Sequence, residues 1–184
     1  MKKFLSIAAV IALSISAVNA KNFTIDPAHS SVGFEVEHML ISKVNGEFNT
    51  FNGVLDIDPS TKKINKFEGE INIGSVDTKN SKRDAHLKTS DFFDASKFQK
   101  ATFKMTQQKG DKIYGDLTIR GIKKPVVWEV DIKGPGTNPM TKKQLMALEI
   151  SGKINRKDFQ VGTETPNAIV SDEVKVKIQI EASE

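Results

Sequence analysis

The chain contains no cysteine. Disulfide bonds, thiolate nucleophiles, iron–sulfur clusters and cysteine-ligated zinc sites are therefore excluded. Histidine is also scarce: there are three in 184 residues, and no two of them stand at the H-x-H or H-x-x-x-H spacing typical of a metal site. We therefore expect neither a metal site nor a cofactor.

Long hydrophobic runs are confined to the N-terminus. Lys2 and Lys3 precede an apolar run at residues 4–15, and Val18-Asn19-Ala20 places small residues at positions −3 and −1 of a cleavage site. This pattern is typical of a secretory signal peptide, here residues 1–20. No later stretch approaches the roughly 18 to 20 apolar residues of a membrane helix. We expect residues 21–184 to form one domain that is exported to the periplasm.

The chain also lacks a large excess of charge of one sign. It has 27 Lys and Arg against 23 Asp and Glu, a formal charge of +4, and two of those lysines lie in the leader. What remains is 25 basic against 23 acidic residues. Such a balance gives no electrostatic footprint for nucleic acid, so we expect no nucleic-acid partner.

Apolar and polar residues alternate along most of the remaining chain, which indicates about eight β-strands joined by short turns. Strands with one apolar and one charged face are typical of an antiparallel sheet with one wet face. The alternating runs are residues 32–38, 44–51, 54–58, 67–73, 101–106, 113–119, 126–132, 146–154 and 174–180.

Two closures of this sheet are open, a sandwich and a barrel. Several strands are long, and Gly69, Gly115 and Gly152 sit on their apolar faces. Long strands in a closed barrel bend sharply, and glycine permits that bend. The glycines favour the barrel, an all-β fold with a single antiparallel sheet.

One segment interrupts the strand pattern. Ser81 and Asp84 have the S-x-x-D spacing of a capping box, which predicts a helix start at residue 81. A second short turn, capped by Ser90 or Asp91, would follow. An insert of roughly twenty residues between strands is unusually long and often covers an opening.

Eight short motifs in order resemble those of the YceI-like family, and together they span essentially all of residues 21–184. The motifs are IDPAHS at 25–30 (followed by Phe34 and His38), GEF at 46–48, SVDT at 75–78, RDAHL at 83–87, DFFD at 91–94, GDLTIRG at 115–121, RKDF at 156–159 and SDEV at 171–174.

This resemblance implies a lipocalin-like antiparallel barrel, secreted or periplasmic, that encloses a long apolar ligand. The ligand classes it implies are polyisoprenoids, including isoprenoid quinones, and fatty-acid-like amphiphiles. One departure is visible: Gln160 stands where the family commonly has glycine after the Asp-Phe pair, and Gly162 is placed to take over its backbone role.

The expected ligand contacts fall into two groups. Tail contacts are expected from the inward apolar faces of the strands and from the phenylalanines of the insert, although the insert side chains would equally complete an ordinary core. They are Phe34, Val36, Phe48, Ile71, Phe92, Phe93, Phe98, Phe103, Met105, Leu117, Trp128, Leu148 and Ile150. Contacts to the polar head are expected from rim residues, namely His38, Arg83, Asp84, His86, Arg156 and Asp158.

Several alternatives remain open at this point. Arg83 with Asp158, or Arg156 with Asp84, would serve equally as internal ion pairs that tie the insert to the barrel. A structural or stress-response barrel filled by its own side chains is the main functional alternative. No G-x-S-x-G motif supports a hydrolase, so we expect no enzymatic activity. A homodimer would be one way to cover an open, apolar mouth.

Overall fold

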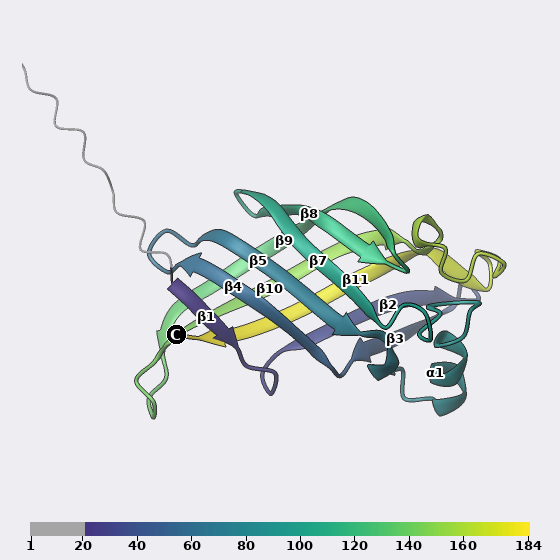
Figure 1. Cartoon of the computed structure of the whole chain (residues 1–184), viewed down its shortest axis with the longest axis horizontal. Coiled ribbons are helices and arrows are strands. Elements are labelled where there is room, and N and C mark those ends of the chain that lie inside the picture. The colour runs from purple at the N-terminus through teal and green to yellow at the C-terminus, as the bar shows by residue number, and fades with distance from the viewer. Residues whose placement is uncertain (1–20) are drawn as a thin grey trace, which may run out of the picture.

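The computed structural model describes residues 21–184, and the predicted signal peptide at residues 1–20 lies outside this described part (Figure 1). The described residues form eleven strands, one α-helix and two 3-10 helices. In chain order they are β1 (Lys21–Ile25), β2 (Ser31–His38), β3 (Ser42–Phe48), β4 (Phe51–Asp58), β5 (Lys63–Asn72), η1 (Ile73–Ser75), β6 (Val76–Asp77), α1 (Ser81–Leu87), β7 (Lys100–Lys109), β8 (Lys112–Ile119), β9 (Ile122–Thr137), β10 (Gln144–Asn155), η2 (Arg156–Phe159) and β11 (Val170–Ser183).

Eight of the strands close into an antiparallel barrel. They pair in the order β1, β4, β5, β7, β8, β9, β10 and β11, and β11 returns to β1 through Thr24 opposite Ser183 and Ile25 opposite Ala182. The predicted all-β, lipocalin-like barrel is confirmed, and a two-sheet sandwich is excluded because the ring has no open edge between β1 and β11.

Strand β11 is long enough to have two neighbours on the same side. Its C-terminal end pairs with β1, and its N-terminal half pairs with β2, from Gln179 opposite Ser31 to Val170 opposite His38. Strands β3 and β6 continue outward from β2. One end of the barrel is therefore closed by strand pairing, whereas the other is walled by the β2–β3 hairpin.

The helical insert lies at this second end, where Figure 1 shows α1 beside β3. The predicted helix is present, but its N-cap is Asn80 rather than Ser81: the Asn80 side chain accepts a hydrogen bond from the Arg83 amide at 3.1 Å. Asp84 instead accepts bonds from the amide and hydroxyl of Thr78. Residues 88–99 continue as turns without a second helix.

Two of the three glycines on the apolar face make room for aromatic rings. A Cβ atom on Gly152 would lie 1.9 Å from Cδ1 of Trp128, and one on Gly115 would lie 2.5 Å from the Phe103 ring. These two rings are stacked with their centroids 4.6 Å apart. Glycine is thus needed at both positions because any side chain would displace the stacked pair.

The interior differs between the two ends. Near β1 and the β9–β10 hairpin it is filled, and side chains there are at most 1% exposed: Leu55, Ile57, Ile113, Met146 and Leu148. At the other end several inward side chains are only partly buried. Among residues 21–184, no helix has the length and apolar character needed to cross a membrane.

Candidate functional site

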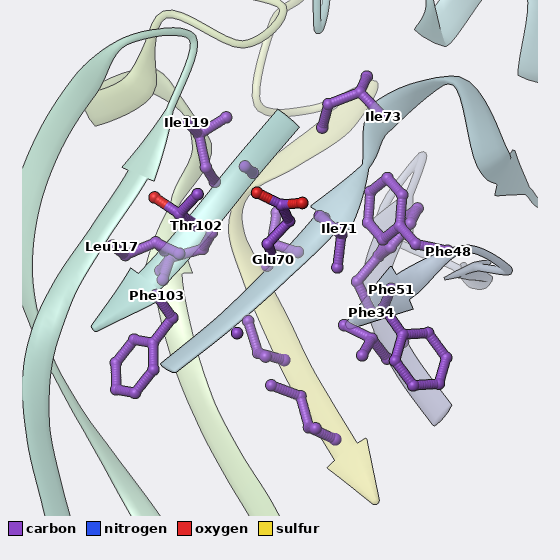
Figure 2. A pocket seen from close by; sticks show the side chains of 18 of the residues that line it. Phe34, Phe48, Phe51, Glu70, Ile71, Ile73, Thr102, Phe103, Leu117 and Ile119 are labelled. Atoms are coloured by element: carbon purple, nitrogen blue, oxygen red, sulfur yellow. The ribbon is translucent and has the colours of Figure 1, made fainter. Parts of the chain in front are cut away.

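The half-filled end of the barrel contains an apolar cavity of about 180 Å³ (Figure 2). Its lining comes from all eight barrel strands, from β2 and β3, from the insert and from the residues at η2. Nine of the thirteen predicted tail residues line it: Phe34, Val36, Phe48, Ile71, Phe92, Phe93, Phe103, Leu117 and Trp128. The period-two alternation therefore identified the inward faces of these strands correctly.

Aromatic rings form the floor of the cavity. Phe103 stacks on Trp128, and Phe67 lies 5.8 Å from Phe103 between ring centroids. All three side chains are at most 7% exposed. They separate the cavity from the filled end of the barrel, so a ligand would rest on the face of this cluster.

A second aromatic group connects the wall to the insert. Phe34 lies 5.8 Å from Phe48, and Phe48 contacts Phe93 edge-on at the same centroid distance. Phe92 lies beside Gly162, where a Cβ atom would come within 2.7 Å of its ring. Residues 88–99 and the segment after η2 thus meet above the cavity and cover it.

Four predicted tail residues lie elsewhere. Phe98 packs against Gly121 and under the Arg120 guanidinium, on the outer side of the insert. Leu148 and Ile150 are 0% and 2% exposed in the packed part of the barrel, and Met105 packs against the core without lining the cavity. Leu148, Ile150 and Met105 lie at inward-facing positions of their strands, as the lining residues do. They differ from the lining residues in their position along the barrel axis.

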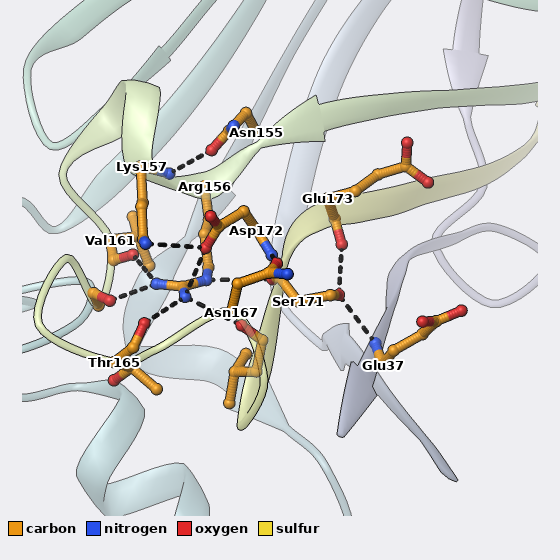
Figure 3. A network of polar contacts seen from close by, with 12 residues as sticks. Glu37, Asn155, Arg156, Lys157, Val161, Thr165, Asn167, Ser171, Asp172 and Glu173 are labelled. Carbon is orange, nitrogen blue, oxygen red and sulfur yellow. Dashed lines mark hydrogen bonds and ion pairs between the residues drawn. The ribbon is translucent and has the colours of Figure 1, made fainter. Parts of the chain in front are cut away.

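Arg156 is the one charged residue of the predicted head group that lines the cavity, and its guanidinium is fully used by the protein (Figure 3). It is 4% exposed. It donates to the carbonyls of Ser171 (3.1 Å), Val161, Gly162, Thr165 and Val170, and to the Asp172 carboxylate at 2.8 Å. These bonds occupy all five of its N–H groups.

Arg156 therefore holds the segment after η2 in place and has no donor left for a ligand. Burial lowers the pKa of the guanidinium, and the charge of Asp172 opposes that shift. The structure favours the ion-pair alternative for this residue, with Asp172 as the partner in place of Asp84. Lys157 also approaches Asp172, at 3.2 Å.

Arg83 and Asp84 do not reach the cavity. Arg83 donates to the hydroxyl and the carbonyl of Thr78, both at 2.7 Å, and Asp84 accepts from the Thr78 hydroxyl at 2.6 Å. The two residues clamp the start of α1 to the residue after β6. Neither forms the predicted pair with Asp158 or Arg156, since both are used locally.

The other predicted rim residues lie outside the cavity. His86 contacts Phe92 edge-on at 5.0 Å and lies 3.7 Å from Asp91, so it covers the outer side of a lining residue. His38 is half-buried at the end of β2, and Asp158 is exposed in η2.

The backbone at Gln160 adopts the left-handed conformation (φ 56°), as Gly162 does (φ 59°). The glycine that the resemblance implies at this position would suit this turn, which Gln160 adopts at a cost in strain. Its side chain is exposed and does not line the cavity.

Sequence reasoning missed Arg120. Its Nη1 donates to the carbonyl of Ser90 at 2.9 Å and to that of Phe92. Arg120 thus fixes the insert, whereas Arg156 fixes the segment after η2. The GDLTIRG motif contains it, but its partners are backbone carbonyls thirty residues away, which have no signature in the sequence.

One group in the described part of the chain could hold a metal ion, and it does not line the cavity. Single ligand atoms of Asp26, His29 and Glu181 lie within 4.8 Å of one another. Nδ1 of His29 hydrogen-bonds to Asp26 at 2.9 Å, and this bond raises the pKa of His29 and lowers that of Asp26. The bond organises the β1–β2 turn, together with the bond from the Ala28 amide to the Asp26 carboxylate.

The chemistry of the cavity is that of a hydrocarbon site. Its lining is apolar apart from a few residues such as Glu70, whose carboxylate accepts bonds from Asn52 (3.1 Å) and Lys100 (2.8 Å). A cavity with so apolar a lining binds mainly by burial of apolar surface.

Comparison with known proteins gives a consistent result. A family model described as the YceI-like domain matches residues 23–182. A UPF0312 protein of Staphylococcus aureus is 36% identical over 166 residues, which cover 88% of this chain and 97% of that protein.

Solved structures of other proteins give the same result. The Campylobacter jejuni YceI protein superposes with a TM-score of 0.76 at 31% identity, covering 100% of this chain and 99% of that one. Burkholderia cenocepacia BcnA gives 0.74 at 25% identity, covering 86% and 99%. A polyisoprenoid-binding domain from Saccharophagus degradans shares the fold, with a TM-score of 0.67 at 13% identity and coverage of 88% and 97%.

Proposed function

The chain belongs to the YceI-like family, and we propose that it is a periplasmic carrier that sequesters a long-chain amphiphilic lipid in its barrel. The candidate ligands are a polyisoprenoid, an isoprenoid quinone or a fatty-acid-like molecule. The observation that carries the proposal is the apolar cavity above the Phe103–Trp128 floor. The polyisoprenoid-binding domain with the same fold supports the first class.

Apolar burial alone supplies enough affinity for such a ligand. Each buried CH2 group contributes about 0.8 kcal/mol, so some twenty buried carbons give a gross term above roughly 10 kcal/mol before the costs of immobilisation. Because one methylene separates two candidates by only about 1–3 kcal/mol, the site selects weakly among tails of similar length.

The cavity volume limits how much of a tail is held in the described conformation. About 180 Å³ is less than the roughly 300–1,000 Å³ of ordinary ligand sites. A long tail enters fully only if Phe92 and Phe93 move outward with the insert. The polar head then stays in water at the rim, because Arg156 has no free donor for it and Arg83 does not line the cavity.

The periplasmic location rests on the predicted signal peptide at residues 1–20, and no catalytic step is needed for sequestration. Export would place the barrel in the aqueous space between two membranes, where a long-chain lipid is insoluble. Hiding the tail from water is then the whole mechanism.

Mass spectrometry of an organic extract from natively purified protein tests the proposal. We expect one amphiphile at near-stoichiometric amount. Stripped protein should respond to added geranylgeraniol through the fluorescence of Trp128, the sole tryptophan, which lines the cavity. If the extract holds no such amphiphile and the fluorescence stays constant, the carrier function is wrong and the side-chain-filled structural barrel takes its place.

A further inference from the structure

The turn between β2 and β3 exposes three consecutive large apolar side chains. Met39 is 54% exposed, Leu40 66% and Ile41 88%. Ile169, from the segment before β11, lies beside them and is 43% exposed, and its carbonyl accepts a hydrogen bond from the Met39 amide at 2.9 Å. We call these four residues the apolar tip.

The backbone of the turn makes this exposure more unusual. Met39 and Leu40 both have positive φ angles, 52° and 60°. Two successive left-handed residues are typical of a tight hairpin turn, which strongly prefers asparagine, aspartate and glycine. The chain has large apolar residues at positions where both the backbone and contact with water disfavour them.

The apolar tip lies at the covered end of the cavity. His38 pairs with Val170, and the cavity-lining residues Val36 and Val170 flank the tip on its two strands. Figure 1 shows the β2–β3 hairpin at the same end as α1 and the connection from η2 to β11. A surface that contacts the tip would therefore also face the segments that cover the cavity.

The segments that form the tip are uncharged, and the charged residues immediately beside them are Glu37, Lys43 and Glu164. Residues 38–42 and 165–170 contain no Asp, Glu, Lys or Arg, although 27% of the chain is charged. The patch is also small. A stable protein interface uses about 20–30 residues on each side, and the tip offers four side chains on a protruding turn. A second copy of the chain would need a much larger surface.

We infer that the apolar tip inserts into a lipid bilayer and holds the covered end of the cavity against the membrane. A bilayer accepts a short, uncharged, convex apolar turn without a matching surface, which a protein partner would have to supply. The role of this contact rests on the proposed function, because it brings the covered end of the cavity to the place where a long-chain lipid is found.

Flotation with vesicles of phosphatidylethanolamine and phosphatidylglycerol tests the inference. Residues 21–184 are used, since they supply every strand of the closed barrel and omit the apolar leader. The double variant Leu40→Gly/Ile41→Ser removes two apolar side chains and relieves the positive φ at residue 40. Met140→Ser is the matched control: Met140 is 87% exposed on the β9–β10 loop at the opposite end of the barrel.

We expect the double variant to lose vesicle binding by about tenfold or more, with an unchanged or higher Tm, and Met140→Ser to bind like the wild type. The inference is overturned if the wild type does not float, if both variants float equally, or if the double variant instead converts a dimer to a monomer in sedimentation. The Trp128 response to geranylgeraniol is measured in parallel without vesicles, so a failure of membrane docking is distinguished from a failure of lipid binding.

Discussion

The two ends of the barrel have the same alternating sequence pattern and different interiors. At the end closed by β1, inward side chains such as Leu55 and Leu148 are 0% exposed and line no part of the cavity. At the other end, Val36 and Ile71 face a cavity. The difference comes from what closes each end: strand pairing with β1 brings the walls together, whereas the hairpin and the covering segments hold them apart.

The cover of the hollow end is held by arginines. Arg156 binds the segment from residue 161 to residue 172, and Arg120 binds residues 90–92. Hydrogen bonds to backbone carbonyls fix a loop without filling the space beneath it. The packed end supplies stability by burial, and the hollow end keeps its shape through polar contacts, which leaves its interior free for a ligand.

Removal of the Arg156 side chain should have the largest effect. In Arg156→Met, Asp172 and five carbonyls lose their partner, and breaking a buried pair costs about 3–5 kcal/mol. We expect this loss in the free energy of unfolding measured with urea. Lys157→Met, which removes a more exposed partner of the same carboxylate, should cost about 0–1 kcal/mol. Equal effects of the two variants would contradict the assigned role of Arg156.

A matched pair of truncations compares the two interiors directly. Leu148→Ala, in the filled end, should cost about 2–5 kcal/mol because it opens a new cavity among fixed neighbours. Ile71→Ala, at the edge of an existing cavity, should cost about 1–2 kcal/mol, since its side chain is only partly buried. Urea unfolding measures both. If the two losses are the same, the cavity is not a persistent feature of the protein in solution.

Filling the hollow end should change binding more than stability. Val36→Phe adds a ring into the cavity, so we expect affinity for geranylgeraniol to fall by about tenfold or more while stability changes by about 1 kcal/mol or less. Val54→Phe, the same substitution at a 43% exposed position, is the control and should bind normally. Trp128 fluorescence reports the binding. Unchanged affinity in Val36→Phe would place the ligand elsewhere.

The sequence predicted nine of the eleven strands, the insert and the inward-facing residues, because these follow from local patterns; it missed the short strands β1 and β6. It did not separate Leu148 from Ile71. Both lie on the apolar face of a strand, and only the pairing register decides that one meets a facing side chain and the other a cavity. The position of a residue along the barrel axis depends on non-local strand pairing, so the two-residue alternation within one strand does not predict it.

The rim shows the same limit for polar residues. Arg83, Asp84 and Arg156 were predicted at the rim from their motifs, and the ion-pair alternative was left open. Their actual partners include the hydroxyl and carbonyl of Thr78 and the carbonyls of residues 161–171. Every residue except proline offers the same backbone groups. The sequence therefore indicates that an arginine has an acceptor, but it does not indicate which residue supplies that acceptor.

The smallest expected effect concerns a charge on the outer face of the hollow end. Glu35, on β2, is 8% exposed, and hydrogen bonds from Lys177, Lys43 and Lys175 lower its pKa from 4.5 to about 2. Because the pKa of Glu35 is lower in the folded state than in the unfolded state, this carboxylate stabilises the fold above about pH 4.5, and the contribution is lost as the pH falls toward 2.

We expect Glu35→Gln to lower the urea midpoint at neutral pH. Between about pH 4.5 and 2, the urea midpoint of this variant should fall less steeply than that of the wild type. Glu173→Gln, which removes an exposed pair with Lys153, is the control and should keep the wild-type decline. If Glu35→Gln keeps it too, the three lysines do not stabilise the charge that holds β2, β3 and β11 together around the cavity.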